Sequence, residues 1–306
     1  MSDPRFERAL AYLASGQTHA AIDMLAQLLG EDPEEPVYHA VLAAALLRQK
    51  RLAGAEYELA VAQGLDPNLP YVYYVRSQLL LLKRKPRQAL ESCDEALRLE
   101  PDFVDALLMQ ARLYLLTEQR EEALDRLERA AVLAPDSLDV LVAFGDFHNA
   151  RGNPERALEF ARDALRIDAG SADANVLMGE TMLALGDAAE ADMHARYAVS
   201  QLPDDEGALR LLVNVRMRQN WFVGLWWRMN NRIVRLGTAQ QGLVLILGFL
   251  VFQLAAQIFT DLDYPTTGAV LGYAWLGIVV YSWVGIPVYQ RAVAKALSDF
   301  QFNPKF

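Results

Sequence analysis

Histidine and cysteine are the residues of this sequence best suited to metal binding or nucleophilic chemistry, and their spacing favours neither. The four histidines, His19, His39, His148 and His194, include no pair at metal-ligand spacing, and no His-Glu-x-x-His or paired-cysteine motif occurs. Cys93 is the single cysteine, so no disulfide can form within the chain, and we expect it to be a small buried residue. These residues predict neither a metal site nor a cofactor.

Motifs for phosphate binding and acyl transfer are also missing. Glycines occur singly, without a phosphate-cradling loop, and there is no Gly-x-Ser-x-Gly elbow. Glu121 and Glu122 are expected at a helix start, where the helix dipole explains a carboxylate pair better than acid–base catalysis does. The sequence therefore predicts a protein that is not an enzyme.

Charge is divided unevenly between two parts of the chain. Before Gly207 there are 20 Lys and Arg against 36 Asp and Glu, and from Gly207 onward there are nine against three. The acidic part would repel a phosphate backbone, so no nucleic acid is expected as a partner.

A proline recurs with a step of 34 residues in the acidic part. The column consists of Pro33, Pro67, Pro101, Pro135 and Pro203, with Ala169 in the vacant slot. Three columns of mostly small residues keep the same step: Ala21, Ala55, Ala89, Ala123, Ala157 and Ala191; Ala9, Ala43, Ser77, Ala111, Gly145 and Gly179; and Leu28, Ala62, Ala96, Ala130, Ala164 and Ala198. Small residues let crossing helices approach closely. The period predicts a helical solenoid in which these columns are packing contacts.

These columns resemble the tetratricopeptide repeat (TPR) family, whose unit is a pair of antiparallel helices ending at a turn proline. The resemblance covers Ser2 to Asp205 in about six copies, and the best copy is Val104 to Ser137. Arg5 and Leu28 depart from the family pattern in the first copy, as expected of a terminal repeat. The resemblance implies an all-α fold with a right-handed helical solenoid over residues 1–205.

Two turns define each expected repeat. Gly16, Gly152 and Gly186 share one phase between paired helices, where a positive φ ends a helix at little cost. At the other turn, the residue before each proline is pushed out of the helical region, so the second helix should stop there.

The resemblance also implies a concave protein-binding groove, formed mainly by the first helix of each pair. Repeat phase places Val37, Ala40, Ala44, Leu47, Tyr71, Tyr74, Gln78, Leu81, Leu108, Arg112 and Leu115 there in repeats two to four, and Asp139, Asp146, Asn149, Asp173 and Glu180 in repeats five and six. Leu47, Leu81 and Leu115 are equally well explained as core between repeats. Tyr71 and Tyr74 are the expected exposed anchors.

The part after Glu206 has the composition of a membrane anchor. No charged side chain lies between Arg235 and Asp261 or between Asp263 and Arg291, and each gap exceeds the roughly 20 residues needed to cross a bilayer core. We expect a transmembrane helical hairpin within residues 237–290, with spans at 242–259 and 267–289. A buried soluble hairpin is the alternative.

Two features of the expected hairpin suggest helix contacts. They are the small-xxx-small pair Gly268 and Gly272, and the polar residues Gln253 and Gln257 inside the first span.

Residues 206–236 carry an amphipathic pattern with two open interpretations. They form either a capping repeat or a helix in the membrane interface. The expected membrane-interface residues are Trp221, Trp226, Trp227, Arg228, Arg232 and Arg235. Basic residues on both sides of the hairpin predict cytoplasmic repeats and termini, including a short tail at 291–306.

The combination predicts a membrane-anchored interaction scaffold. Its TPR groove would recruit or assemble protein partners, and its hairpin would contact the lipid bilayer. The alternative is an assembly subunit of a larger membrane complex for envelope biogenesis, secretion or transport, which contacts other subunits or a second copy through the hairpin. Five lysines against 24 arginines favour a bacterial source, and hence the bacterial inner membrane.

Overall fold

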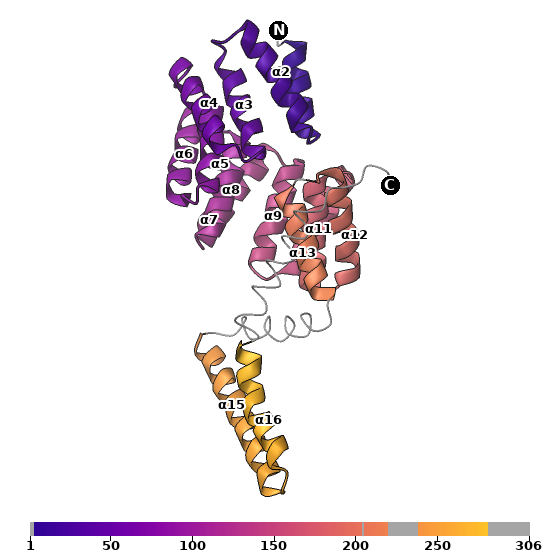
Figure 1. The fold of residues 1–306 in the computed structure, drawn as a ribbon. Coiled ribbons are helices and arrows are strands. Elements are labelled where there is room, and N and C mark those ends of the chain that lie inside the picture. The colour runs from indigo at the N-terminus through magenta and orange to yellow at the C-terminus, as the bar shows by residue number, and fades with distance from the viewer. Residues whose placement is uncertain (1–2, 204, 220–237, 281–306) are drawn as a thin grey trace. The chain divides into compact units, whose positions relative to one another are not determined.

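The computed structural model describes residues 3–203, 205–219 and 238–280, and all regular secondary structure in those ranges is α-helical (Figure 1). The chain divides into two compact units. The first comprises Met1–Gly186 with Ser200–Leu202, and the second comprises Asp187–Val199 with Pro203–Phe306.

Helices of the first unit follow the predicted 34-residue step. They are α1 (Pro4–Ala14), α2 (Thr18–Glu31), α3 (Pro36–Arg48), α4 (Leu52–Leu65), α5 (Pro70–Leu82), α6 (Pro86–Leu99), α7 (Val104–Leu116), α8 (Arg120–Leu133), α9 (Leu138–Ala150), α10 (Pro154–Ile167) and α11 (Ala172–Leu185). Consecutive helices such as α3 and α4 pack as antiparallel pairs (Figure 1). The predicted all-α helical-repeat solenoid is thereby confirmed.

The turn inside each helix pair repeats one backbone conformation. As predicted, φ is positive at Gly16 (74°), Gly152 (75°) and Gly186 (100°). Three residues that are not glycine adopt positive φ at the same phase, namely Lys50 (57°), Arg84 (58°) and Glu118 (61°). In the turns before Gly186, the next residue donates its N–H to a carbonyl five residues back, as from Gln119 to Tyr114 at 2.9 Å. This bond closes the helix end whether or not the left-handed residue is glycine.

Replacing Glu118 with glycine should stabilise the first unit. The left-handed conformation costs a residue with a Cβ about 1 kcal/mol, and glycine avoids this cost. Part of the resulting stabilisation is offset because glycine is more flexible in the unfolded chain. We expect the free energy of unfolding to rise by about 0.5 kcal/mol, measured by thermal denaturation. Glu118→Ala keeps the Cβ and is the matched control. A lower melting temperature for the glycine variant than for the alanine variant would contradict this account.

The small-residue columns lie where helices cross, as predicted. Ala21, Ala55, Ala89 and Ala123 are all 0% exposed. Gly145 is tighter still, because a Cβ there would clash with the side chain of Leu177 on α11. A larger residue in these columns would push neighbouring helices apart.

The first helices of the pairs form one continuous layer. Helices α3, α5, α7, α9 and α11 contact one another in series. Polar bonds reinforce the layer: Arg48 Nη1 donates to the Leu13 carbonyl at 2.7 Å, and Asn149 Nδ2 donates to Thr181 Oγ1 at 2.9 Å. All the residues that repeat phase assigns to the binding groove lie on the helices of this layer.

The first repeat departs from the family pattern at Arg5 for a visible reason. Arg5 Nη2 lies 2.7 Å from Asp3 Oδ2 and 2.7 Å from Glu31 Oε2. These partly exposed pairs join the start of α1 to the end of α2. A charged residue is accommodated here because its two partners are carboxylates and all three side chains are partly exposed.

The second unit contains α12 (Ala188–Gln201), α13 (Glu206–Gln219), α15 (Thr238–Asp261) and α16 (Pro265–Val280). Arg216 Nε on α13 lies 4.0 Å from Asp192 Oδ1 on α12. Helix α13 falls in the segment predicted to cap the repeats or lie in the interface. The rest of that segment lies outside the described residues, as do residues 291–306 and the predicted interface residues Trp221, Trp226, Trp227, Arg228, Arg232 and Arg235.

Helices α15 and α16 pack side by side as a hairpin (Figure 1). A Cβ at Gly268 would clash with Thr260 and lie 2.7 Å from the Ala256 carbonyl, so α16 approaches the α15 backbone closely there. The Trp275 ring lies 5.5 Å from that of Phe252, measured between centroids. Gly268 therefore marks a helix contact, and the contact is within the hairpin.

The predicted spans at 242–259 and 267–289 fall on α15 and α16, and the second continues past the described residues. Within residues 3–203, 205–219 and 238–280, no helix combines the length and the apolar character that a bilayer-spanning segment needs. Membrane crossing stays a prediction.

Candidate protein-binding face

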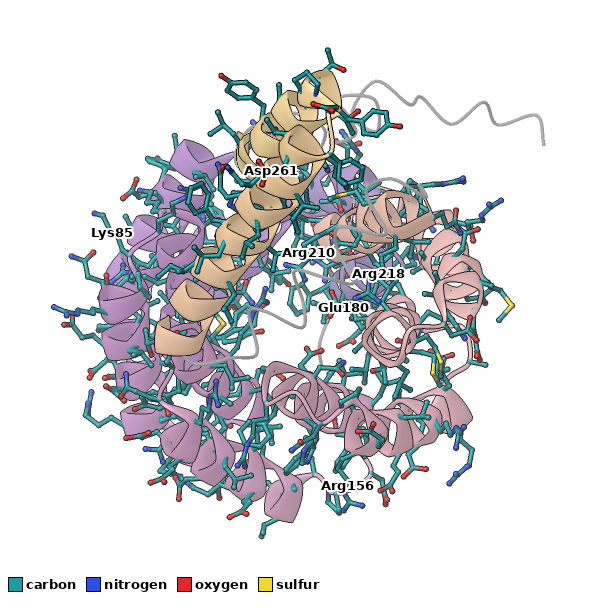
Figure 2. All side chains as sticks on the ribbon, turned by 90° about the horizontal axis from the view of Figure 1, so that it is seen from below. Lys85, Arg156, Glu180, Arg210, Arg218 and Asp261 are labelled. Carbon is teal, nitrogen blue, oxygen red and sulfur yellow. The ribbon has the colours of Figure 1, made fainter. Side chains whose placement is uncertain are left out.

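The first-helix layer presents a run of aromatic, polar and acidic side chains. We call this surface the inner face, and it consists of Tyr71, Tyr74 and Gln78 on α5, Asp105, Leu108 and Arg112 on α7, Asp139 and Asp146 on α9, and Asp173 and Glu180 on α11. Figure 2 shows Glu180 on the inner side of the curved array of helices, whereas Lys85 and Arg156 point outward.

Two tyrosines form the aromatic part of the inner face. The ring centroid of Tyr74 lies 5.8 Å from that of Tyr71 and 5.4 Å from that of Phe103. Both tyrosines are half-buried and pack against the core of repeats one to three. Burial is the main reason that the pKa of each phenol is raised, and the charge of Asp105 adds to it. Both hydroxyls therefore stay protonated and can donate hydrogen bonds.

Two carboxylates lie beside the tyrosines. Asp105 and Asp139 stand at the same repeat phase as Tyr71, on the consecutive contacting helices α5, α7 and α9, and the charges of both carboxylates raise the pKa of Tyr74. The pKa of Asp105 is itself raised, first by burial and then by repulsion from Asp139. Asp105 nevertheless keeps much of its surface exposed to solvent. A side chain that is open to water yet surrounded by protein atoms is typical of a concave surface.

Some positions predicted for the groove are buried in the core, and others are only half-buried. Ala40 is 0% exposed and Leu47 is 6% exposed, which agrees with the alternative interpretation of Leu47 as packing between repeats. Val37 is half-buried against the same cluster. Leu108 is half-buried between two clusters that involve α7, α8 and α9. Neighbouring first helices cover these apolar positions, so the available surface is more polar than the predicted trough.

Comparison with known families agrees with the helix-pair architecture. The family model described as tetratricopeptide repeat matches residues 12–79 and 80–142. Residues 12–79 and 80–142 therefore carry the tetratricopeptide repeat pattern. Proteins with this fold are in general modules for protein–protein interaction and not enzymes.

Solved structures share the TPR fold at low sequence identity. A thermophilic TPR protein from Thermus thermophilus is 22% identical, with a TM-score of 0.54 over 58% of this chain and 97% of that chain. PilW, a widely conserved type IV pilus biogenesis factor, is 18% identical, with a TM-score of 0.50 over 68% and 96%. The APC/C hetero-tetramer Cut9–Hcn1 is 13% identical, with a TM-score of 0.62 over 95% and 54%. A comparison with curated proteins finds no match.

Asp105 is the member of the inner face that sequence reasoning missed. It stands at the same TPR phase as Tyr71 and Asp139, one 34-residue step from each. The signal was therefore present, but the expected groove residues of repeat four were limited to Leu108, Arg112 and Leu115. The structure adds Phe103 as well, through its ring contact with Tyr74.

The remaining predicted residues also lie on first helices of the TPR pairs. The Gln78 side chain opposes the rise in the pKa of Tyr74. Arg112 is exposed on α7. Asp146, Asp173 and Glu180 each interact with other groups of the chain. The centre of the inner face is therefore Tyr71, Tyr74, Asp105 and Asp139. The other residues of the inner face extend this surface.

Cys93 is part of the core of the first unit. Its side chain is 0% exposed, as predicted for a small buried residue. Burial raises the pKa of the thiol to about 12, so the reactive thiolate is suppressed at neutral pH.

Proposed function

We propose that this protein recruits a protein partner through the inner face of its TPR domain and is held at a membrane by its C-terminal helices. Such a tether raises the effective concentration of a partner near the bilayer, so a moderate affinity is sufficient. The observation that carries the proposal is the set of half-buried tyrosines beside partly exposed carboxylates on one layer of helices.

The composition of the inner face fits partner recognition. Tyr71 and Tyr74 combine apolar surface with protonated hydroxyls and are already held by packing, so little side-chain entropy is lost on binding. Aromatic residues fixed in this way commonly dominate the affinity of an interface. Leu108 and Arg112 extend the surface along α7.

Photo-crosslinking in cells tests recruitment through the inner face. A photoreactive amino acid at Arg112 should give a covalent adduct with a second protein, because this exposed position lies on the inner face. The matched control is Glu128, which is exposed on α8, a second helix of its pair. Both positions lie in one repeat, so expression and folding should be comparable. Adducts that form from Glu128 and never from Arg112 would place the interface elsewhere.

The hairpin supports the membrane part of the proposal. Large apolar side chains are exposed on both helices, including Val251, Leu254 and Ile258 on α15 and Val270 and Leu276 on α16. Apolar side chains exposed along both helices are expected where lipid, rather than water, is the surrounding solvent. The long uncharged stretches of the sequence agree with this interpretation.

Localisation follows as a proposal from the basic flanks of the hairpin. We place the repeats and both termini in the cytoplasm, at the inner membrane of a bacterium. A cysteine introduced at Thr266, in the first turn of α16, should then react with an impermeant maleimide added outside intact cells. A cysteine at exposed Ala53 on α4 should react only after lysis, and buried Cys93 should stay silent in both. Labelling of Ala53→Cys in intact cells would reverse the topology.

A second candidate function is assembly within a larger membrane complex. It is favoured by a groove between α15 and α16 that is lined in part by Gln253, Gln257 and Tyr273. Polar side chains on an otherwise apolar hairpin can bond to another transmembrane helix. A photoreactive residue at Gln257 would then crosslink to a membrane protein, and the absence of any adduct from this position would argue against this candidate.

A further inference from the structure

The inner face contains a charge arrangement that partner recruitment alone does not explain. Asp105 and Asp139 are exposed carboxylates one 34-residue step apart on the contacting helices α7 and α9, and burial together with the charge of Asp139 raises the pKa of Asp105. In the part of the chain that the structure describes, neither carboxylate forms an ion pair. Arg48 lowers the pKa of Tyr71 through its charge, and its guanidinium Nη1 is engaged with the Leu13 carbonyl at 2.7 Å.

A helix-dipole role accounts for only part of this arrangement. Asp105 and Asp139 each lie in the first turn of their helix, where a negative charge is normally favoured. At Asp105, however, burial and repulsion outweigh that benefit, because the net effect is a raised pKa.

Aromatic rings next to the carboxylates add a second recognition element. Tyr71, Tyr74 and Phe103 form a chain of ring contacts with centroid separations of 5.8 and 5.4 Å. Ring faces attract cations, and arginine in particular stacks on them with its guanidinium plane. Carboxylates beside aromatic rings therefore complement a basic side chain in both charge and shape.

We propose that the inner face selects a partner segment carrying an arginine or lysine, whose cationic group is received by Asp105 and Asp139 and whose stem lies against Tyr71 and Tyr74. This inference rests on the proposed function, because it specifies the partner of the same surface. The basic group would relieve the repulsion between the two carboxylates. An acidic segment would meet the same repulsion that already acts between them.

Selection from a random peptide library tests the inference while the partner is still unidentified. The probe is a library of random 12-residue peptides displayed on phage, selected against the full-length protein in mild detergent. We expect the enriched sequences to contain arginine or lysine next to apolar residues. The same selection against the double variant Asp105→Asn/Asp139→Asn should lose this enrichment.

Affinity measurements on one enriched peptide then isolate the charge effect. Fluorescence anisotropy should show that the double asparagine variant binds about tenfold more weakly, as expected for the loss of a facing charge pair. Replacing the basic residue of the peptide with neutral citrulline should cause a similar loss with the unaltered protein, and no further loss with the variant. Glu121→Gln/Asp125→Asn removes two exposed carboxylates from α8 and should change the affinity less than twofold.

Thermal melting distinguishes a loss of binding from a loss of folding in the double asparagine variant. Because the pKa of Asp105 is raised, neutral asparagine removes an unfavourable charge and should not lower the melting temperature at pH 7. Tyr71→Phe/Tyr74→Phe, which keeps the rings, provides a second folded variant and should retain basic enrichment.

The outcomes separate this inference from the proposed function. Enriched peptides that lack basic residues but compete with one another, and lose binding when exposed Arg112 is replaced by glutamate, would overturn the inference and leave the inner face as a binding surface. Basic peptides that bind equally well to the double asparagine variant would also overturn it. Enrichment of no peptide that depends on the inner face would overturn both.

Discussion

Replacing Phe147 with alanine should lower the free energy of unfolding of the first unit by about 3–5 kcal/mol, the largest effect we expect from one substitution. The Phe147 side chain is 1% exposed on α9. It belongs to a core cluster with Ala111 of α7 and with Ala123 and Leu127 of α8. The guanidinium carbon of Arg151 lies 5.5 Å from the centroid of the Phe147 ring.

The effect should be local, because each repeat of a solenoid contacts only its neighbours. Phe147 links α9 to the preceding helix pair, so its loss should weaken the coupling between helices α1–α8 and helices α10–α11. Hydrogen exchange should show α9 and α10 losing protection while α3 to α6 keep theirs. Phe147→Leu fills much of the space and should cost roughly 1 kcal/mol. Equal losses for alanine and leucine, or uniform loss of protection, would refute this view of the core.

The helices and the small residues at their contacts could be predicted from the repeat step alone. A residue that returns every 34 positions as Ala21, Ala55, Ala89 and Ala123 has to meet the same environment each time, and all four are fully buried. The step fixes these positions because every helix pair packs on an equivalent pair.

The turns were predicted only where glycine marked them. Lys50, Arg84 and Glu118 adopt the left-handed conformation without glycine, so residue type gave no signal. Their phase was informative, because Gly16 and Gly152 lie one or more whole repeats away. The recurring helix-closing bond imposes the conformation, and residue preference is secondary.

The inner face was predicted less completely than the core. Phase identifies which positions lie on a first helix, but it does not say how far the neighbouring helix covers them. Leu47 is buried and Tyr74 is half-buried. The Asp105 side chain is exposed to solvent, although neighbouring protein atoms still raise its pKa. These differences depend on the crossing of particular helices, which the period does not specify.

The C-terminal hairpin leads to the second large effect. Replacing Leu250 and Leu254 of α15 with lysine should release the protein from membranes. Their side chains are 48% and 62% exposed, so the change leaves the contact between α15 and α16 in place. Each lysine in the middle of an apolar segment disfavours insertion by about 3 kcal/mol, and two together should shift partition by more than a thousandfold.

Fractionation of cells that express the full-length protein provides the measurement. We expect the unaltered protein in the membrane fraction after alkaline carbonate extraction, and the double lysine variant in the supernatant. Leu250→Met/Leu254→Met keeps the apolar character and should stay with the membrane. Val132→Lys, at an 83% exposed position on α8, adds a charge to the TPR domain and should change nothing. If the unaltered protein is extracted by carbonate, or if the double lysine variant remains in the membrane, the hairpin does not anchor the protein through its apolar surface, and recruitment through the inner face must act in solution or through another subunit.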